Sequence, residues 1–362
     1  MHGYDDNKII PGLRKQLVSS DTIPAPKVYF SAPAIDLDSY DSIIICMSGG
    51  KDSIACLLHL IDQGVNLSRV ELWHHDVDGR EGSTLMDWPF MADYNIKLAH
   101  TFGVPLYFSW LEGGFEGEML KDNGYSRPHH VQTPEGLLVL PRDTIRAKPG
   151  TRLKFPQLSS NLQTRWCSSA LKIDVGRRAL NNQSRFDGQR VLFITGERRA
   201  ESTNRGRYNQ FEPHACDRRS GRKSRLVDAW RPVLDWPEER VWETLQRYGV
   251  LAPVPYRLGW GRSSCMKCIF IDAVLWATLR HYFPGSIDDI MGYEERFGTT
   301  INRSRKRIPV RELSVKVKPL DIEDGEALLQ AVRREYFLPV LTSSEQWQLP
   351  AGAYKKTGCG PT

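Results

Sequence analysis

The stretch Ser42-Ile-Ile-Ile-Cys46-Met47-Ser48-Gly49-Gly50-Lys51-Asp52-Ser53 decides the fold of this chain. Its first half, residues 42–47, is a short apolar run rich in β-branched side chains, which predicts a strand buried on both faces. The glycines end that run, and residues 53–63 follow with apolar side chains at helical spacing before Gly64. A buried strand that turns through glycines into a helix is the opening unit of a parallel sheet.

The elements outward from this unit alternate in type. We predict further strands and helices in the order 69–75 (strand), 87–102 (helix), 104–110 (strand), 168–180 (helix), 189–195 (strand) and 237–248 (helix). This alternation predicts the α/β class, with a doubly wound, Rossmann-like parallel sheet.

The remaining segments divide the chain. We expect an N-terminal extension over 1–40, a core over 41–250 and a C-terminal, cysteine-containing region over 251–362, whose architecture the sequence does not predict. Residues 111–164 contain glycines and prolines but little periodicity, so we interpret them as an insertion over the carboxyl edge of the sheet, where such folds bind ligands.

Composition excludes several classes of protein. Hydrophobic residues make up 40% and charged residues 25% of the 362, which is typical of globular proteins. No apolar run approaches the ~20 residues that cross a bilayer, and the first residues do not resemble a signal peptide. Seven cysteines in such a chain indicate a reducing compartment, so we expect a cytoplasmic protein without membrane contact.

Positive charge is concentrated locally, although the net charge is only +6. Residues 198–225 contain nine Arg or Lys and three acidic residues, and a second basic cluster occupies 303–307. Each cluster is either a solvated surface or a contact for a phosphate-rich partner.

The turn after the first strand has the composition of a phosphate-binding loop. Gly49 and Gly50 allow backbone N–H groups to approach an anion, and the helix N-terminus adds positive charge. Ser48 and Ser53 supply hydroxyl donors, and Lys51 supplies a mobile cation. The spacing is not that of a Walker loop.

This Ser-Gly-Gly-Lys-Asp-Ser string resembles the PP-loop of the adenine nucleotide α-hydrolase superfamily, whose members split ATP between its α and β phosphates. Further strings, over about residues 40–275, resemble the phosphoadenosine-phosphosulfate (PAPS) reductase family. They are Arg165-Trp166-Cys167 with Lys172, residues 195–202 with Arg205, Trp230-Arg231-Pro232-Val233-Leu234-Asp235-Trp236, and Cys265-Met266-Lys267-Cys268.

The resemblance implies ATP and Mg²⁺ as cofactors and assigns roles to matching residues. It implies catalytic roles for Lys51, Asp52, Cys167 and Arg198. The nucleotide-binding residues it implies are Ser48, Gly49, Gly50, Lys51, Asp52, Ser53, Asp76, Asp78, Gly196, Arg199 and Arg205. Asp76 and Asp78 have a second interpretation, as ordinary caps of the strand before them.

The resemblance also implies a cysteine site. Cys167, Cys265 and Cys268 match three of the four cluster ligands found in iron–sulfur members, but Ser168 stands where the other cysteine is expected. Cys216 is a candidate fourth ligand, although its place does not match the family pattern. A four-iron four-sulfur cluster, a zinc ion and free thiols that relay sulfur all remain open.

Among non-reductase relatives, the chain most resembles the ATP-pyrophosphatase subunits of bacterial DNA phosphorothioation systems (Dnd/Ssp-type). That implies adenylation of an acceptor oxygen, a DNA backbone phosphate, followed by sulfur insertion. The implied partners are DNA, a cysteine desulfurase carrying a persulfide, and other subunits of the modification system.

Three alternatives stay open. The first is a sulfonucleotide reductase that uses Cys359, because Cys359-Gly360 resembles part of the reductases' C-terminal motif, although its Glu and His are missing. A tRNA-thiolating enzyme would use the same loop. A regulatory module that binds nucleotide without turnover is the third.

Overall fold

The structure is a computed structural model that describes residues 25–221, 223–302 and 307–355. Four features singled out from the sequence therefore lie wholly or partly outside the described residues: the N-terminal extension as far as residue 24, Arg222, most of the basic cluster 303–307, and Cys359.

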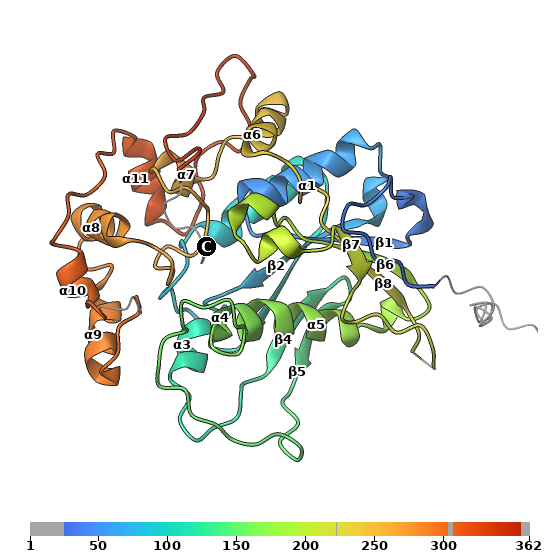
Figure 1. Ribbon diagram of the computed structural model, residues 1–362, viewed down its shortest axis with the longest axis horizontal. Helices are drawn as coiled ribbons and strands as arrows, with labels where there is room; N and C mark the ends of the chain where they lie inside the picture. Colours follow the sequence, from blue (N-terminus) through green and yellow to red (C-terminus); the bar gives the residue numbers. More distant parts are fainter. Residues whose placement is uncertain (1–24, 222, 303–306, 356–362) are drawn as a thin grey trace, which may run out of the picture.

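One mixed sheet organises the described part of the chain (Figure 1). Its strand order is β5-β4-β3-β2-β1-β6-β8-β7, and the five strands from β3 to β8 in that order run parallel. The bounds are β1 Ser42–Cys46, β2 Val70–Asp76, β3 Leu106–Leu111, β4 His129–Thr133, β5 Gly136–Leu140, β6 Arg190–Ile194, β7 Phe211–Pro213 and β8 Leu226–Trp230. The predicted α/β class with a doubly wound sheet is confirmed.

The central strand explains why the sheet is covered on both sides. Ile43, Ile44 and Ile45 of β1 are fully buried. Ile43 and Ile45 belong to one hydrophobic cluster and Ile44 to a second, because successive side chains of a strand point to opposite faces. Burial on both faces favours the continuous β-branched run found there.

Helices cover the two faces of the sheet. Helices α1, α2 and α6 contribute to the first cluster and α5 to the second, and Figure 1 places α1 and α6 on the side of the sheet opposite α4 and α5. The bounds are α1 Lys51–Asp62, α2 Met91–Thr101, α3 Gly114–Met119, α4 Trp166–Ser168, α5 Asp174–Asn181, α6 Glu238–Arg247, α7 Val254–Arg257, α8 Ala273–Tyr282, α9 Asp288–Phe297, α10 Val310–Leu313 and α11 Gly325–Ala331.

The insertion is more regular than the sequence suggested. It contains α3 and the hairpin β4–β5, which extends the sheet antiparallel to β3. The side chains of His129 and Val131 are buried with Leu140 opposite, which is the alternation of a half-buried strand. Strand β7 forms an antiparallel edge at the other end of the sheet.

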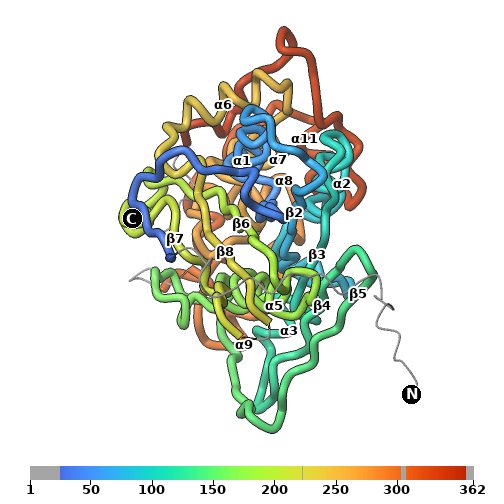
Figure 2. The backbone as a smooth tube through the Cα atoms, turned by 90° about the vertical axis from the view of Figure 1, so that its right-hand side faces the viewer, coloured from blue at the N-terminus to red at the C-terminus, as the bar shows by residue number. Residues whose placement is uncertain are grey.

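The C-terminal region packs onto the first cluster. Buried residues of α8 to α11, including Trp276, Ile290 and Ala327, belong to the same hydrophobic cluster as Ile43 and Ile45. Figure 1 shows these helices to the left of the sheet, so they lie behind it in Figure 2, where the right-hand side of Figure 1 faces the viewer. No helix among the described residues is both long and apolar enough to span a bilayer.

Candidate functional site

The loops after β1 and β6 meet where the strand order reverses. Strand β1 pairs with β2 on one side and with β6 on the other, so the carboxyl ends of β1 and β6 flank the switch point of the sheet. A Cβ atom on Gly196 would lie 2.8 Å from the backbone of Asp52 and Ser53. The glycine is therefore required for the loop after β6 to touch the start of α1.

Hydrogen bonds within the loop hold it in a compact turn. Gly50 donates its N–H to Ser48 Oγ at 3.3 Å, and Ser53 Oγ donates to the Gly50 carbonyl at 2.8 Å. Gly49 has φ +75°, and a Cβ there would lie 2.4 Å from Met91 Sδ, so both its conformation and its surroundings require glycine. Gly50 caps α1 without a side-chain hydrogen bond.

Lys51 does not extend freely into solvent as a mobile cation. Its side chain is 4% exposed, and Nζ lies 3.3 Å from Asp52 Oδ2 and 3.6 Å from Glu238 Oε1. The ammonium group also lies 5.8 and 5.3 Å from the ring centres of Trp242 and Tyr256. Burial lowers the pKa of Lys51, but Tyr256 and the two carboxylates outweigh it and raise the pKa above its usual value.

Arg198 joins the same group of charges from the other loop. Its Nε donates to Asp52 Oδ1 at 2.6 Å, and an NH2 nitrogen lies 3.6 Å from Glu238 Oε2. Lys51 and Arg198 hold the pKa of Asp52 below its usual value against the opposing effect of burial. We call Lys51, Asp52, Arg198 and Glu238 the loop network.

Three of the four residues predicted to be catalytic thus lie together, and Glu238 was missed. Its signal in the sequence was available: it follows Pro237 at the first turn of a predicted helix, where an acidic residue is usually read as helix stabilisation. Only tertiary packing brings that turn to Lys51.

Two other arginines predicted to bind the nucleotide have structural partners instead. Arg199 donates to Asp235 at 2.5 Å, to the Tyr208 carbonyl at 2.6 Å and to the Phe30 carbonyl at 2.5 Å. Arg205 is paired with Glu201. Arg199 therefore holds the segment before β1 against the loop after β6.

A carboxylate group follows β2. Asp78 accepts backbone N–H groups from Met86 and Asp87 at 2.9 and 2.8 Å, which matches the capping interpretation of this residue. Burial, reinforced by Asp87 and Asp78 and opposed by Arg80, raises the pKa of Asp76 to about 7. Burial and Asp78 raise the pKa of Asp87 to about 6.

Three of the four predicted metal-binding cysteines gather around one lysine. Burial raises the pKa of Cys167 to about 11, with Cys268 adding to the rise and the nearby Lys172 opposing it. Desolvation lowers the pKa of Lys172, but the nearby Cys265, Cys167 and Asp87 outweigh it and raise the pKa above its usual value. Cys167 is thus a protonated thiol at neutral pH and a weak nucleophile.

Cys216 does not belong to this group, which corrects the proposal that it supplies a fourth ligand. Its thiol lies 3.8 Å from the Arg177 carbonyl and packs in the second hydrophobic cluster. Arg177 is ten residues after Cys167 on one helical run, which separates the two by ~15 Å.

The residues present do not complete a metal site. Among the described residues, no three His, Cys, Asp or Glu side chains are arranged to hold a metal ion. A four-iron cluster or a structural zinc needs four ligands, and the group around Lys172 offers three thiols. At the phosphate loop, Asp52 is engaged by Lys51 and Arg198, so Mg²⁺ would be held mainly by the phosphates of ATP.

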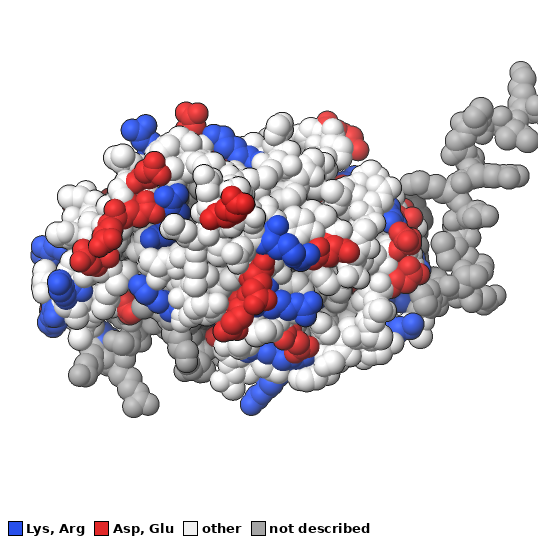
Figure 3. All heavy atoms as spheres, turned by 90° about the horizontal axis from the view of Figure 1, so that it is seen from above, with Lys and Arg blue, Asp and Glu red and all other residues white. Residues whose placement is uncertain are grey.

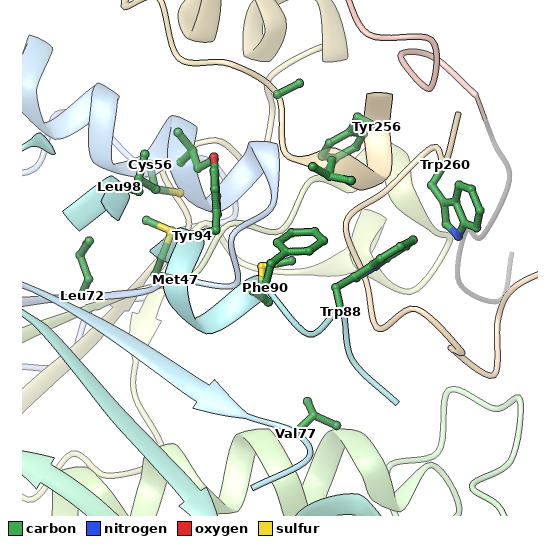
Figure 4. Packing of buried hydrophobic residues seen from close by; sticks show 14 of the residues in the cluster. Met47, Cys56, Leu72, Val77, Trp88, Phe90, Tyr94, Leu98, Tyr256 and Trp260 are labelled. Carbon is green, nitrogen blue, oxygen red and sulfur yellow. The ribbon is translucent and has the colours of Figure 1, made fainter. Parts of the chain in front are cut away.

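The cysteine loop and the phosphate loop are in contact. A Cβ on Gly50 would lie 3.6 Å from the Ser263 carbonyl, and Trp88 Nε1 donates to the Ser264 carbonyl at 2.9 Å. Trp88 also packs edge-on against Trp260, with ring centres 5.5 Å apart (Figure 4). Because Cys265 follows Ser264 directly, the thiols and the phosphate loop border one site.

The basic segment 198–225 offers less free charge than its composition suggested. Five of its nine cations have acidic partners within the protein: Arg198, Arg199, Arg205, Arg219 and Arg225. Arg207, Arg218 and Lys223 are exposed. On the face of the molecule over α1 and α6, basic and acidic side chains are interspersed (Figure 3).

Comparison with known proteins gives one relative of low similarity. Over 258 residues, 69% of this chain and 74% of the other, the sequence is 22% identical to a protein of Escherichia phage 186 described as an uncharacterized 37.8 kDa protein in the gpa 5′ region. No family profile matches the chain.

Proposed function

We propose that this protein is an ATP pyrophosphatase that adenylates an acceptor oxygen, a DNA backbone phosphate, and prepares it for sulfur insertion. The observation that carries the proposal is the contact of the Ser48–Ser53 loop with Gly196 and Arg198 at the switch point of the sheet. Parallel α/β sheets bind nucleotides at this point, and a glycine turn before a helix suits phosphate.

The loop network supplies a reason for ATP cleavage rather than simple binding. Its two cations and two carboxylates balance each other, so the bound polyphosphate would compete with Asp52 and Glu238 for Lys51 and Arg198. Positive charge that is already in place stabilises the charge that develops on a leaving pyrophosphate. Such preorganised groups contribute several kcal/mol.

The reaction balances in two displacements. An acceptor oxygen forms a bond to the α-phosphorus of ATP, the bond to the β-phosphate breaks, and pyrophosphate leaves with the electron pair. A persulfide sulfur, delivered by a cysteine desulfurase, then forms a bond to the activated acceptor phosphorus and displaces AMP. A second thiol breaks the remaining sulfur–sulfur bond by exchange, which releases the thiolated acceptor and leaves that thiol and the carrier cysteine as a disulfide. Chemistry of this kind requires reduced thiols, which supports a cytoplasmic location, and the six described cysteines are unpaired.

Acceptor-dependent pyrophosphate release tests the proposal. The full chain is incubated with ATP and Mg²⁺, together with desulfurase and persulfide donor, and with either duplex DNA, tRNA or a sulfonucleotide. Stimulation by DNA alone supports the proposal, and stimulation by tRNA alone replaces it with tRNA thiolation. The Lys51→Met variant controls for contaminating enzymes that cleave ATP to AMP and pyrophosphate. Arg333→Ala controls for the loss of one positive charge at an exposed site.

A sulfonucleotide reductase is the second candidate, and one contact favours it. The backbone N–H of Tyr354 donates to Glu238 Oε1 at 3.4 Å, so residue 354 lies beside the loop network. Cys359, which lies outside the described residues, is five residues further along the chain. If wild-type protein reduces a sulfonucleotide and Cys359→Ser does not, the protein is a reductase. If Cys359→Ser releases pyrophosphate from ATP at the wild-type rate, the result agrees with adenylation.

A further inference from the structure

The antiparallel extension of the sheet carries basic side chains that form no ion pair with any acidic residue the structure describes. His129 begins β4, where it pairs with Leu111 of β3 and Leu140 of β5. It is 6% exposed, and its Nε2 atom finds no hydrogen-bond partner within the described part of the chain. A buried ring nitrogen without a partner costs free energy unless a ligand satisfies it.

Two arginines lie near this histidine, one bonded to its cross-strand partner Leu140 and one just after that partner in the chain. Arg178 of α5 donates an NH2 group to the carbonyls of Leu140 and Pro141 at 3.3 and 3.1 Å, whereas its buried Nε is unpartnered. Arg142 follows Pro141 in the chain and is exposed. Leu140 therefore relates the three basic residues to one another. It is the cross-strand neighbour of His129, its carbonyl accepts from Arg178, and Arg142 follows it by two residues.

The electrostatics of this group favour an anion as its ligand. Burial lowers the pKa of His129 to about 4, and Arg178 and Arg142 add to that effect. Burial and Arg142 likewise lower the pKa of Arg178. The exposed Asp174 opposes this shift but does not reverse it. Basic groups that destabilise one another's charge become compatible when an anion lies between them.

We propose that His129, Arg142 and Arg178 form a subsite for one backbone phosphate of the acceptor nucleic acid. This rests on the proposed function, and it places the acceptor beside the insertion, which carries His129 and Arg142. Guanidinium groups match phosphate oxygens, and an imidazole donor adds a third contact. The group lies at the carboxyl edge of the sheet, because Leu111 ends β3 opposite His129.

The position of this subsite suits a nucleic-acid strand that passes the nucleotide-binding loop. Strand β4 is three positions from β1, which corresponds to ~14 Å across the sheet. A DNA strand rises about 3.4 Å per nucleotide along the helix axis. The ~14 Å between the subsite and the phosphate loop therefore corresponds to about four nucleotides of DNA. A phosphate held here would fix the strand while a neighbouring phosphate is presented to ATP.

Salt-dependent DNA binding by the full-length chain is the first test. Arg142→Ala should reduce the slope of log affinity against log salt by about 0.9, the value for one lost phosphate contact. Arg333→Ala, the matched control, should keep the wild-type slope, and neither variant should alter ATP affinity. Equal slopes in wild type and Arg142→Ala overturn the subsite; no nucleic-acid binding by wild type instead overturns the acceptor proposed above.

Inorganic phosphate provides a second readout that does not need nucleic acid. We expect phosphate to raise the pKa of His129, followed by NMR of its ring proton, in wild type and much less in Arg142→Ala. His129→Gln assigns the signal. No response in wild type refutes the subsite. A response together with wild-type binding to RNA but not to DNA retains the subsite and changes the acceptor.

Discussion

Replacing Lys51 by methionine should destabilise the protein and abolish ATP cleavage for separable reasons. Methionine retains the apolar stem between Trp242 and Tyr256 but removes the charge that faces Asp52 and Glu238. Removing one partner from a buried ion pair costs about 3–5 kcal/mol. Arg198 still contacts both carboxylates, so we expect the lower end, about 3 kcal/mol of the free energy of unfolding.

A second substitution separates stability from catalysis. In the double variant Lys51→Met with Glu238→Gln, one cation again faces one carboxylate, and we expect most of the lost stability to return. ATP cleavage should not return, because the cation that faces the leaving pyrophosphate is still absent. Urea unfolding followed by the fluorescence of the ten tryptophans measures the first quantity, and pyrophosphate release measures the second.

Two results would refute this reasoning. Wild-type ATP cleavage by Lys51→Met would remove the loop from the chemistry. Equal free energies of unfolding for the single and double variants would mean that Glu238 is not balanced by Lys51, and the loop network would lose its basis.

Three further outcomes are expected. Gly196→Ala should abolish ATP binding in a titration, because its Cβ would lie 2.8 Å from the backbone of α1; unchanged affinity would contradict the contact. Anaerobically purified protein should hold no stoichiometric iron or zinc, because the group around Lys172 offers only three thiols among the described residues; bound metal that is lost in both Cys265→Ser and Cys216→Ser would restore Cys216 as a ligand. Asp76→Asn should stabilise the protein more at pH 8 than at pH 5 in urea unfolding. The pKa of Asp76 is raised to about 7, so its ionisation costs stability as pH rises from about 4 through 7. An equal gain at both pH values would contradict that.

The sheet and its central loop could be predicted because their signals are local. The isoleucines of β1 and the glycines after it determine strand and turn within twelve residues, and the predicted helix 53–63 overlaps the observed Lys51–Asp62. The hairpin β4–β5 was missed because its turn, between Thr133 and Gly136, follows histidines rather than an apolar run.

The site was less predictable, because its partners are distant in sequence. Composition alone could not distinguish Arg218, which is exposed, from Arg225, which is 4% exposed and paired with Asp187. Likewise, Glu238 acquires its role only through the packing of α6 on α1, which brings it to Lys51. The sequence identifies the chemical type of each residue, but the partners of that residue are determined by tertiary packing.

The position of the bond broken in ATP tests the central proposal most directly. The full chain is incubated with ATP, Mg²⁺, acceptor DNA and the sulfur donor, and its products are separated. We predict AMP and pyrophosphate in equal amounts, with neither formed by Lys51→Met. ADP and inorganic phosphate, or equal product formation by the variant, would contradict cleavage between the α and β phosphates at the Ser48–Ser53 loop.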